Sequence, residues 1–363
     1  MRMRMVAGRT VAAIGLGDVS FARATARNHD PAEVVRRVHD ALELSVDVID
    51  VADEPDALRA VGDAIRSLRA RDRAIAITTV RLPDLRAIAF VQEQIEANLR
   101  ASKLDVLPLV QLPLRAAHLA RLEWPELLFA LERIAREGKV MAWGIAVHRD
   151  DVGDGSDAGA APPEPPPDPL GLAGFTTTSS GLFVPSVAPP TTAPKPVAPL
   201  AHPLALPLAA SLAIDFSLCD RTFDPVLAAR SSHAILAHRP LAGGALAGRL
   251  GTGAVLARND DRRDADADAI AIAVAKLSRL VRDPPPAARA TEAARAITET
   301  TRRPDHVECA TLAELALRFV IDRGAIALPR IVRREDLIEA IAAGSAPPLS
   351  AGYLNIDPVP SPA

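Results

Sequence analysis

Short apolar runs rich in β-branched residues alternate with longer segments of helical periodicity along most of the chain. The first run, TVAAIGLG at 10–17, precedes PAEVVRRVHDALEL at 31–44, where apolar residues recur on one helical face. Asp30 and Pro31 stand where a helix N-cap and a first-turn proline are expected. The pattern predicts a strand followed by an amphipathic helix.

The same unit recurs along the chain and predicts eight strands, at 10–17, 46–51, 74–80, 106–112, 140–147, 208–216, 233–244 and 325–329. Regular alternation of strands and helices favours parallel strands joined by crossover helices. Eight such units predict an α/β fold, a closed (β/α)₈ TIM barrel whose ligands bind at the carboxyl ends of the strands. An open doubly wound sheet is the alternative.

Residues 151–207 interrupt the alternation between the fifth and sixth strands. They are dense in Pro, Ala and Thr, which disfavour regular structure, so we expect a flexible insertion. PxxP-like pieces such as PKPVAP at 194–199 could bind a partner groove, although a plain spacer is the simpler interpretation. The predicted organisation is a first part of the barrel at 1–150, this insertion, the remaining barrel at 208–345 and a tail at 346–363.

The composition is that of a soluble globular protein. With 42 basic and 45 acidic residues, the formal net charge is −3, which gives no argument for nucleic acid or an anionic membrane as a partner. No apolar run approaches the ~20 residues that span a bilayer, and no targeting pattern is present, so we expect a cytoplasmic protein. Cys219 and Cys309 are too few for a disulfide framework and are interpreted as buried thiols.

Taken in order, the local patterns resemble those of the aldo-keto reductases, NADPH-dependent barrel enzymes that reduce carbonyls. The matching segments are IGLG at 14–17, VDVIDVAD at 46–53, LDVLPLVQL at 104–112, EGKVMAWGIAV at 137–147, IDFSLCDR at 214–221, HRPLAGGALAGRL at 238–250 and TLAELALRFVIDRGAIALPR at 311–330. The resemblance touches nearly every predicted barrel unit and implies the barrel fold, a carbonyl-reducing ancestry and NADP(H) as cofactor.

The resemblance also implies a catalytic set of Asp, Tyr, Lys and His, of which this chain keeps one. Asp50 stands at the Asp position, whereas Pro55, Thr79 and Pro113 occupy the Tyr, Lys and His positions. A general acid needs an ionisable group, which proline lacks, and threonine supplies no positive charge to lower the pKa of a phenol. We therefore expect a pseudoenzyme. Asp50 itself could instead have a structural role, as a cap of the turn that follows its strand.

The implied cofactor site matches the family poorly at the nicotinamide end and better at the phosphate end. Ala146, Val147 and Ala213 replace the family's polar carboxamide clamp, while His238, at the aromatic platform position, could still stack on the nicotinamide. At the phosphate end the resemblance assigns the binding residues Pro240, Leu241, Gly243, Gly244, Arg330, Arg333 and Arg334. Small residues there allow close backbone approach, and guanidinium groups suit phosphate.

Two further classes of function stay open. One is a scaffold or regulatory binding module that uses the barrel for its shape and the Pro-rich insertion for interaction. The arginines have a plain interpretation as well, because Glu335 and Asp336 follow them and could pair with them on a solvated face. An active NADP(H)-dependent oxidoreductase that uses His148, His238 or a water as its acid is the other. A metal site among His148, His238 and Asp50 follows no known ligand spacing, and we expect none.

Overall fold

The computed structural model describes residues 1–19, 31–51, 54–80, 88–113, 124–147, 175–177, 183–185, 209–221, 223, 227, 233–248, 267–282 and 309–354. Asp30 and His148, most of the insertion at 151–207, and the end of the tail after residue 354 lie outside the described residues.

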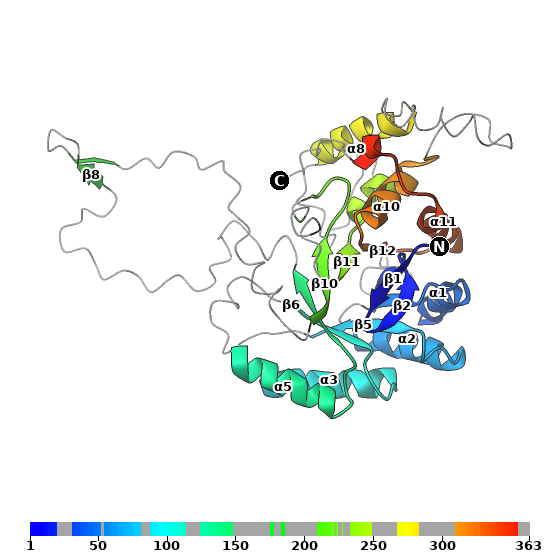
Figure 1. Cartoon of the computed structure of the whole chain (residues 1–363), viewed down its shortest axis with the longest axis vertical. Helices are drawn as coiled ribbons and strands as arrows, with labels where there is room; N and C mark the ends of the chain where they lie inside the picture. The colour runs from blue at the N-terminus through cyan, green and yellow to red at the C-terminus, as the bar shows by residue number, and fades with distance from the viewer. Residues whose placement is uncertain are drawn as a thin grey trace.

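Eight parallel strands form one sheet, which curls into a nearly closed barrel (Figure 1). They are β3 (Leu16–Val19), β4 (Val48–Val51), β5 (Ile75–Thr79), β6 (Leu109–Pro113), β7 (Trp143–Val147), β10 (Ala209–Asp215), β11 (Ala234–His238) and β12 (Ile326–Leu328). Neighbouring strands of the sheet follow one another in this order, from β3 to β12. The predicted (β/α)₈ TIM barrel is confirmed, and the open doubly wound sheet is excluded.

Backbone hydrogen bonds close the barrel between its first and last strands. The N–H of Ala327 donates to the carbonyl of Ala13 (3.0 Å), and the N–H groups of Gly15 and Gly17 donate to Ala327 and Pro329 (2.9 Å each). Glycine is required here, because a Cβ on Gly17 would lie 2.1 Å from the carbonyl oxygen of Leu328. The IGLG segment of the sequence is therefore the seam of the barrel.

An antiparallel hairpin that the sequence analysis did not anticipate precedes the barrel, formed by β1 (Met3–Val6) and β2 (Arg9–Ala12). Ala7 and Gly8 turn the chain with φ of 49° and 75°, which suits a tight hairpin turn. Val6 and Val11 are 1% exposed and pack with the apolar side chains at the amino end of the barrel. The strand expected at 10–17 was thus misplaced, since its first residues belong to this hairpin.

Helices cover the outside of the barrel (Figure 1). They are α1 (Pro31–Glu43), α2 (Pro55–Ser67), α3 (Ile88–Ser102), α5 (Trp124–Arg136), α8 (Ala267–Arg282), α10 (Leu312–Asp322) and α11 (Arg334–Ser345), with a short α12 (Ala351–Leu354) in the tail. Six of these follow predicted helical segments. Helix α8 was not expected from the sequence pattern.

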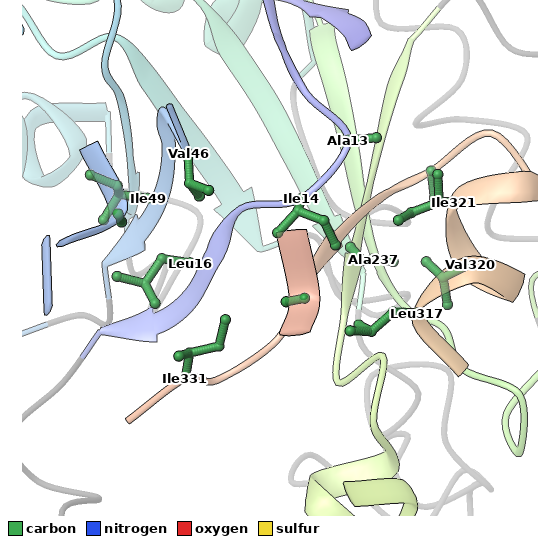
Figure 2. Close-up of a cluster of buried hydrophobic side chains, with 14 of the residues drawn as sticks. Ala13, Ile14, Leu16, Val46, Ile49, Ala237, Leu317, Val320, Ile321 and Ile331 are labelled. Carbon is green, nitrogen blue, oxygen red and sulfur yellow. The ribbon is translucent and has the colours of Figure 1, made fainter. Parts of the chain in front are cut away.

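The main core lies between the strands and these helices. Figure 2 shows Leu317, Val320 and Ile321 of α10 beside Ala237 of β11, and all four side chains are buried. The β-branched and aliphatic outward faces of the strands meet the apolar stripe of each helix, as the alternation of strand and helix requires. This packing fixes the strand ends that carry the candidate site.

Two antiparallel strands, β8 (Phe175–Thr177) and β9 (Phe183–Pro185), are described within the insertion. These short strands are regular structure within a segment whose composition disfavours it. Across the described part of the chain, none of the helices combines the length and hydropathy needed to cross a membrane.

Candidate functional site

The candidate site lies at the carboxyl ends of the barrel strands, where ligands bind in this architecture. Side chains on a strand alternate between the barrel interior and the helices, so the register identifies the interior positions. Buried apolar residues such as Val48, Ile77 and Leu236 form the interior cluster, and the interior-facing residues nearest the carboxyl ends of the strands line the mouth. These mouth positions are Asp50, Thr79, Pro113, Ala146, Asp215 and His238.

Asp50 contacts polar groups from two other strands. It is 8% exposed, and its Oδ2 atom accepts a hydrogen bond from the backbone N–H of Asp18 (3.3 Å). The Nε2 atom of His238 lies 3.9 Å from the same oxygen. Two predicted site residues from strands that are far apart in the sequence, β4 and β11, thus meet at the mouth.

Pro55 begins helix α2 and is exposed. Glu54 before it has an extended backbone with φ of −131°, as a helix N-cap does, and Pro55 occupies the first turn, where proline loses no hydrogen bond. The proline at the position that the resemblance assigns to the acid is therefore a good helix-starting residue. Thr79 and Pro113 are partly buried at the ends of β5 and β6.

The loop after β11 has an unusual backbone. Positive φ values occur at Arg239 (49°), Ala242 (48°), Gly243 (65°) and Gly244 (98°), the last three within a short 3₁₀ segment, Ala242–Ala247. Pro240 is buried and Leu241 is partly buried against the main core, which anchors the loop. The absence of side chains at the two glycines leaves the backbone open to close approach by a ligand.

The three arginines after β12 point to three different acids. Arg330 lies near the mouth, where its Nε is 3.9 Å from Oδ2 of Asp18. Arg333 donates two hydrogen bonds to Asp336 on its own helix, 2.7 and 3.3 Å long, and this contact raises the pKa of Arg333. The guanidinium of Arg334 contacts Asp40 of α1. Only Arg330 is therefore directed toward the strand ends.

Sequence reasoning missed three charged residues at the mouth, namely Asp18, Asp215 and Arg239. Asp18 bridges Asp50 and Arg330 through its backbone N–H and its carboxylate. Asp215 ends β10, is 3% exposed, and lies 3.8 Å from Nη1 of Arg239. A signal was present, because each acid stands at the end of an apolar strand, where its carboxylate would reach the ligand side of the barrel.

Among the described residues, neither a reactive thiol nor a cluster of metal ligands adds chemistry to this site. Among the described residues, no group of three or more His, Cys, Asp or Glu side chains is arranged to hold a metal ion. Cys219 and Cys309 are buried and do not form a disulfide with each other. Burial, and then the charge of Asp220, raises the pKa of Cys219 to about 11, so this thiol is protonated at neutral pH.

Comparison with solved structures gives a consistent result. The chain matches an aldo-keto reductase from Bacillus halodurans in its holo form with a TM-score of 0.60 and 17% identity, over 98% of this chain and 94% of that one. It matches an aldo/keto reductase from Klebsiella pneumoniae in complex with NADP and acetate with a TM-score of 0.55 and 21% identity, over 95% and 89%.

The glycerol dehydrogenase of Gluconobacter oxydans is a third match, with a TM-score of 0.63 and 15% identity over 97% of this chain and 92% of that one. The fold is that of the aldo-keto reductases. A scan of family models and a search of curated proteins find no match, so the likeness to aldo-keto reductases rests on the fold and on the local patterns of the sequence.

Proposed function

We propose that this chain is an aldo-keto-reductase-like barrel that binds NADP(H) and lacks the family's carbonyl-reducing chemistry. The observation that carries the proposal is the content of the barrel mouth. Asp50 is the one residue of the implied catalytic set that is present, and the neighbouring strand ends offer Thr79 and Pro113. Pro55 starts helix α2 at the acid position.

The loss of the acid has a physical consequence. Carbonyl reduction needs a proton donor within hydrogen-bond reach of the developing alkoxide, and its absence typically costs a factor of about 10²–10⁴. Thr79 carries no charge to stabilise an ionised donor, and neither proline can donate a proton. A bound nicotinamide could supply a hydride. The side chains that would donate the proton in the family are absent from the matching positions of this chain.

The phosphate end fits a dinucleotide better. Two of the solved structures with this fold, both from Klebsiella pneumoniae, are complexes with NADP or NADPH. In this chain Gly243 and Gly244 give a left-handed loop without side chains, beside the strand ends. Arg330 adds a guanidinium 3.9 Å from Asp18 near the strand ends, and a guanidinium suits the extra phosphate of NADP(H). Arg333 and Arg334 are expected to contribute less, because Asp336 and Asp40 hold their guanidinium groups by hydrogen bonds, whereas Arg330 approaches Asp18 only to 3.9 Å.

A second candidate is an active oxidoreductase with a different acid. It is favoured by the approach of His238 Nε2 to Asp50 Oδ2 at 3.9 Å, which places an ionisable imidazole beside the retained carboxylate at the barrel mouth. The weakness of this candidate is that His238 also occupies the position expected to stack on the nicotinamide. A scaffold module without nucleotide is the third candidate.

Titration with NADPH and NADH separates the nucleotide-binding candidates from the scaffold. We expect NADPH to bind more tightly, and Arg330→Gln to weaken NADPH by roughly ten- to a hundredfold while leaving NADH nearly unchanged. Arg333→Gln is the matched control, because its guanidinium is held by Asp336. Calorimetry measures each affinity. Equal NADPH binding by Arg330→Gln and the parent, or no binding at millimolar concentration, would contradict the proposal.

Turnover separates the pseudoenzyme from the active oxidoreductase. We expect common aldehydes and ketones to be reduced with NADPH no faster than with a protein blank, as followed by NADPH absorbance. Reduction that scales with protein concentration and is lost in His238→Gln would establish the second candidate instead.

A further inference from the structure

Three methionines lie on the exposed face of the hairpin that covers the amino end of the barrel (Figure 1). Met1, Met3 and Met5 are 39%, 49% and 60% exposed, whereas Arg2 and Arg4 between them are partly buried. This alternation is that of a strand, whose successive side chains point to opposite faces, so the three thioether groups share one face. The chain has four methionines in all, and three of them stand in the segment MRMRM.

Packing does not account for these side chains. Methionine in a folded protein usually fills gaps in an apolar core. On this strand the core contact is made by Val6, which lies on the opposite face and is 1% exposed. The residues paired with Met3 and Met5 across the hairpin are Ala12 and Thr10, which are small and leave room above the strand. An exposed apolar row on an edge strand favours aggregation, so stability and solubility alone would not keep it.

The spacing of the strand suits one shared ligand. Alternate Cα atoms of a strand are ~7 Å apart, and each methionine side chain is unbranched, with three rotatable bonds. The sulfurs of Met3 and Met5 can therefore bend toward one ion held between them. Met1 precedes the first paired residue of the hairpin, and the backbone N–H of Arg2 donates to the carbonyl of Gly344 (2.9 Å). Met1 thus lies just before an anchored residue, where its side chain can complete a set of three sulfurs.

The positive charges of the segment are held on the other face. The guanidinium of Arg2 pairs with Asp322 at the end of α10. Arg4 donates to the carbonyls of Ile321 (2.9 Å) and Gly324 (3.2 Å), in and just after the same helix. Guanidinium groups beside the methionines would repel a cation, but these contacts direct both toward α10. The exposed face therefore presents neutral sulfur atoms.

We propose that Met1, Met3 and Met5 bind Cu(I), a soft monovalent cation, through their three thioether sulfurs. Thioether and thiolate ligands select Cu(I), whereas Mg²⁺, Ca²⁺ and Mn²⁺ prefer oxygen. The two thiols of the chain do not compete on the folded protein, because Cys219 and Cys309 are buried. The inference is independent of NADP(H) binding, since the hairpin packs at the end of the barrel opposite the mouth.

Competition with a chromogenic Cu(I) chelator tests the site on the full chain, without oxygen and with ascorbate as the reductant. We expect one tightly held Cu(I) per chain. Met3→Leu and Met5→Leu should each weaken binding at least about tenfold, because the loss of groups behind a metal ligand already costs that much. The double variant should lose the site.

Met141→Leu is the matched control. Met141 is as exposed as Met1, at 39%, but it stands alone in the sequence, without another methionine near it. This variant should bind Cu(I) as the parent does. Substitutions at exposed positions change stability little, and a melting curve verifies that each variant is folded.

The pH dependence gives a second measurement. Thioethers do not ionise, so the affinity for Cu(I) should be the same at pH 7 and pH 5.5. A site built from histidine or thiolate must lose protons to bind and weakens as the pH falls.

Three results would each overturn the inference: undiminished Cu(I) binding by the double variant, a fall in affinity between pH 7 and pH 5.5, or no binding by the parent. None of them bears on the nucleotide proposal, which is tested by NADPH titration. Should the double variant not fold, the two single variants decide.

Discussion

The two ends of the barrel differ in what their side chains do. At the amino end, Val6 and Val11 of the hairpin complete an apolar cluster whose members are almost fully buried. At the carboxyl end, Asp50 and Asp215 are buried beside His238 and Arg239. Buried carboxylates are costly, whereas apolar burial is favourable. The amino end is therefore built for stability, and the carboxyl end keeps groups that stability alone would not select.

The change occurs within single strands. On β4 the interior face changes from Val48 to Asp50, and on β11 it changes from Leu236 to His238. Two residues along a strand are ~7 Å, so the boundary between the two regions is about one residue pair thick. The barrel thus carries its candidate site on a rigid apolar base.

The sharpest test of this comparison uses one strand. Ile77 and Thr79 lie on the same interior face of β5, with Ile77 fully buried and Thr79 partly exposed at the mouth. Ile77→Ala should lower the free energy of unfolding by about 2–5 kcal/mol, because it leaves a cavity in a packed interior. Thr79→Ala should cost less than about 1 kcal/mol. Urea unfolding measures both, and equal costs would refute the division.

The seam of the barrel gives a smaller effect. Gly17→Ala should cost about 1–3 kcal/mol or more, because the new methyl group meets the Leu328 carbonyl and the backbone must shift. Gly138→Ala is the control: a Cβ there meets nothing within 4 Å, and its φ of 73° alone should cost about 1–2 kcal/mol. A Gly17→Ala variant as stable as the parent would mean that the seam is not tightly packed.

The smallest effect concerns pH. The pKa of Cys219 in the folded chain is about 11, above the ordinary thiol value, so the unfolded thiol ionises first as the pH rises. Stability from this group is complete below about pH 9 and is lost as the pH rises toward 11, on the order of 1 kcal/mol. Cys219→Ala should flatten this part of the stability profile. Urea unfolding at pH 7 and pH 10 tests it, with Cys309→Ala as the control.

Local patterns predicted much of the fold. Alternating apolar runs and amphipathic segments identified seven of the eight barrel strands near their observed positions, because burial on both faces makes parallel strands apolar. The first strand was misplaced because its opening residues, TVA at 10–12, do form a strand, which pairs with Met3, Arg4 and Met5 in the hairpin. Periodicity identifies a strand but does not determine its partner.

The site was predicted less completely. Asp50 and His238 were each identified from a local motif, but their approach across the mouth depends on strands β4 and β11 lying in one barrel. The arginines were grouped because they are close in sequence, whereas the structure directs them to Asp18, Asp336 and Asp40. Helix phase and neighbouring acids decide such directions, and neither is local to the motif.

The sequence by itself determined the βα repeat, the position of the long insertion and the loss of ionisable side chains at three of the four implied catalytic positions, since these depend on residue type and order alone. The tertiary structure decided which charges share the mouth, why Pro55 suits its place at the start of α2, and that Arg2 and Arg4 contact α10, away from Met3 and Met5. Those features arise from contacts between residues far apart in the chain, whose register is fixed only when the barrel closes.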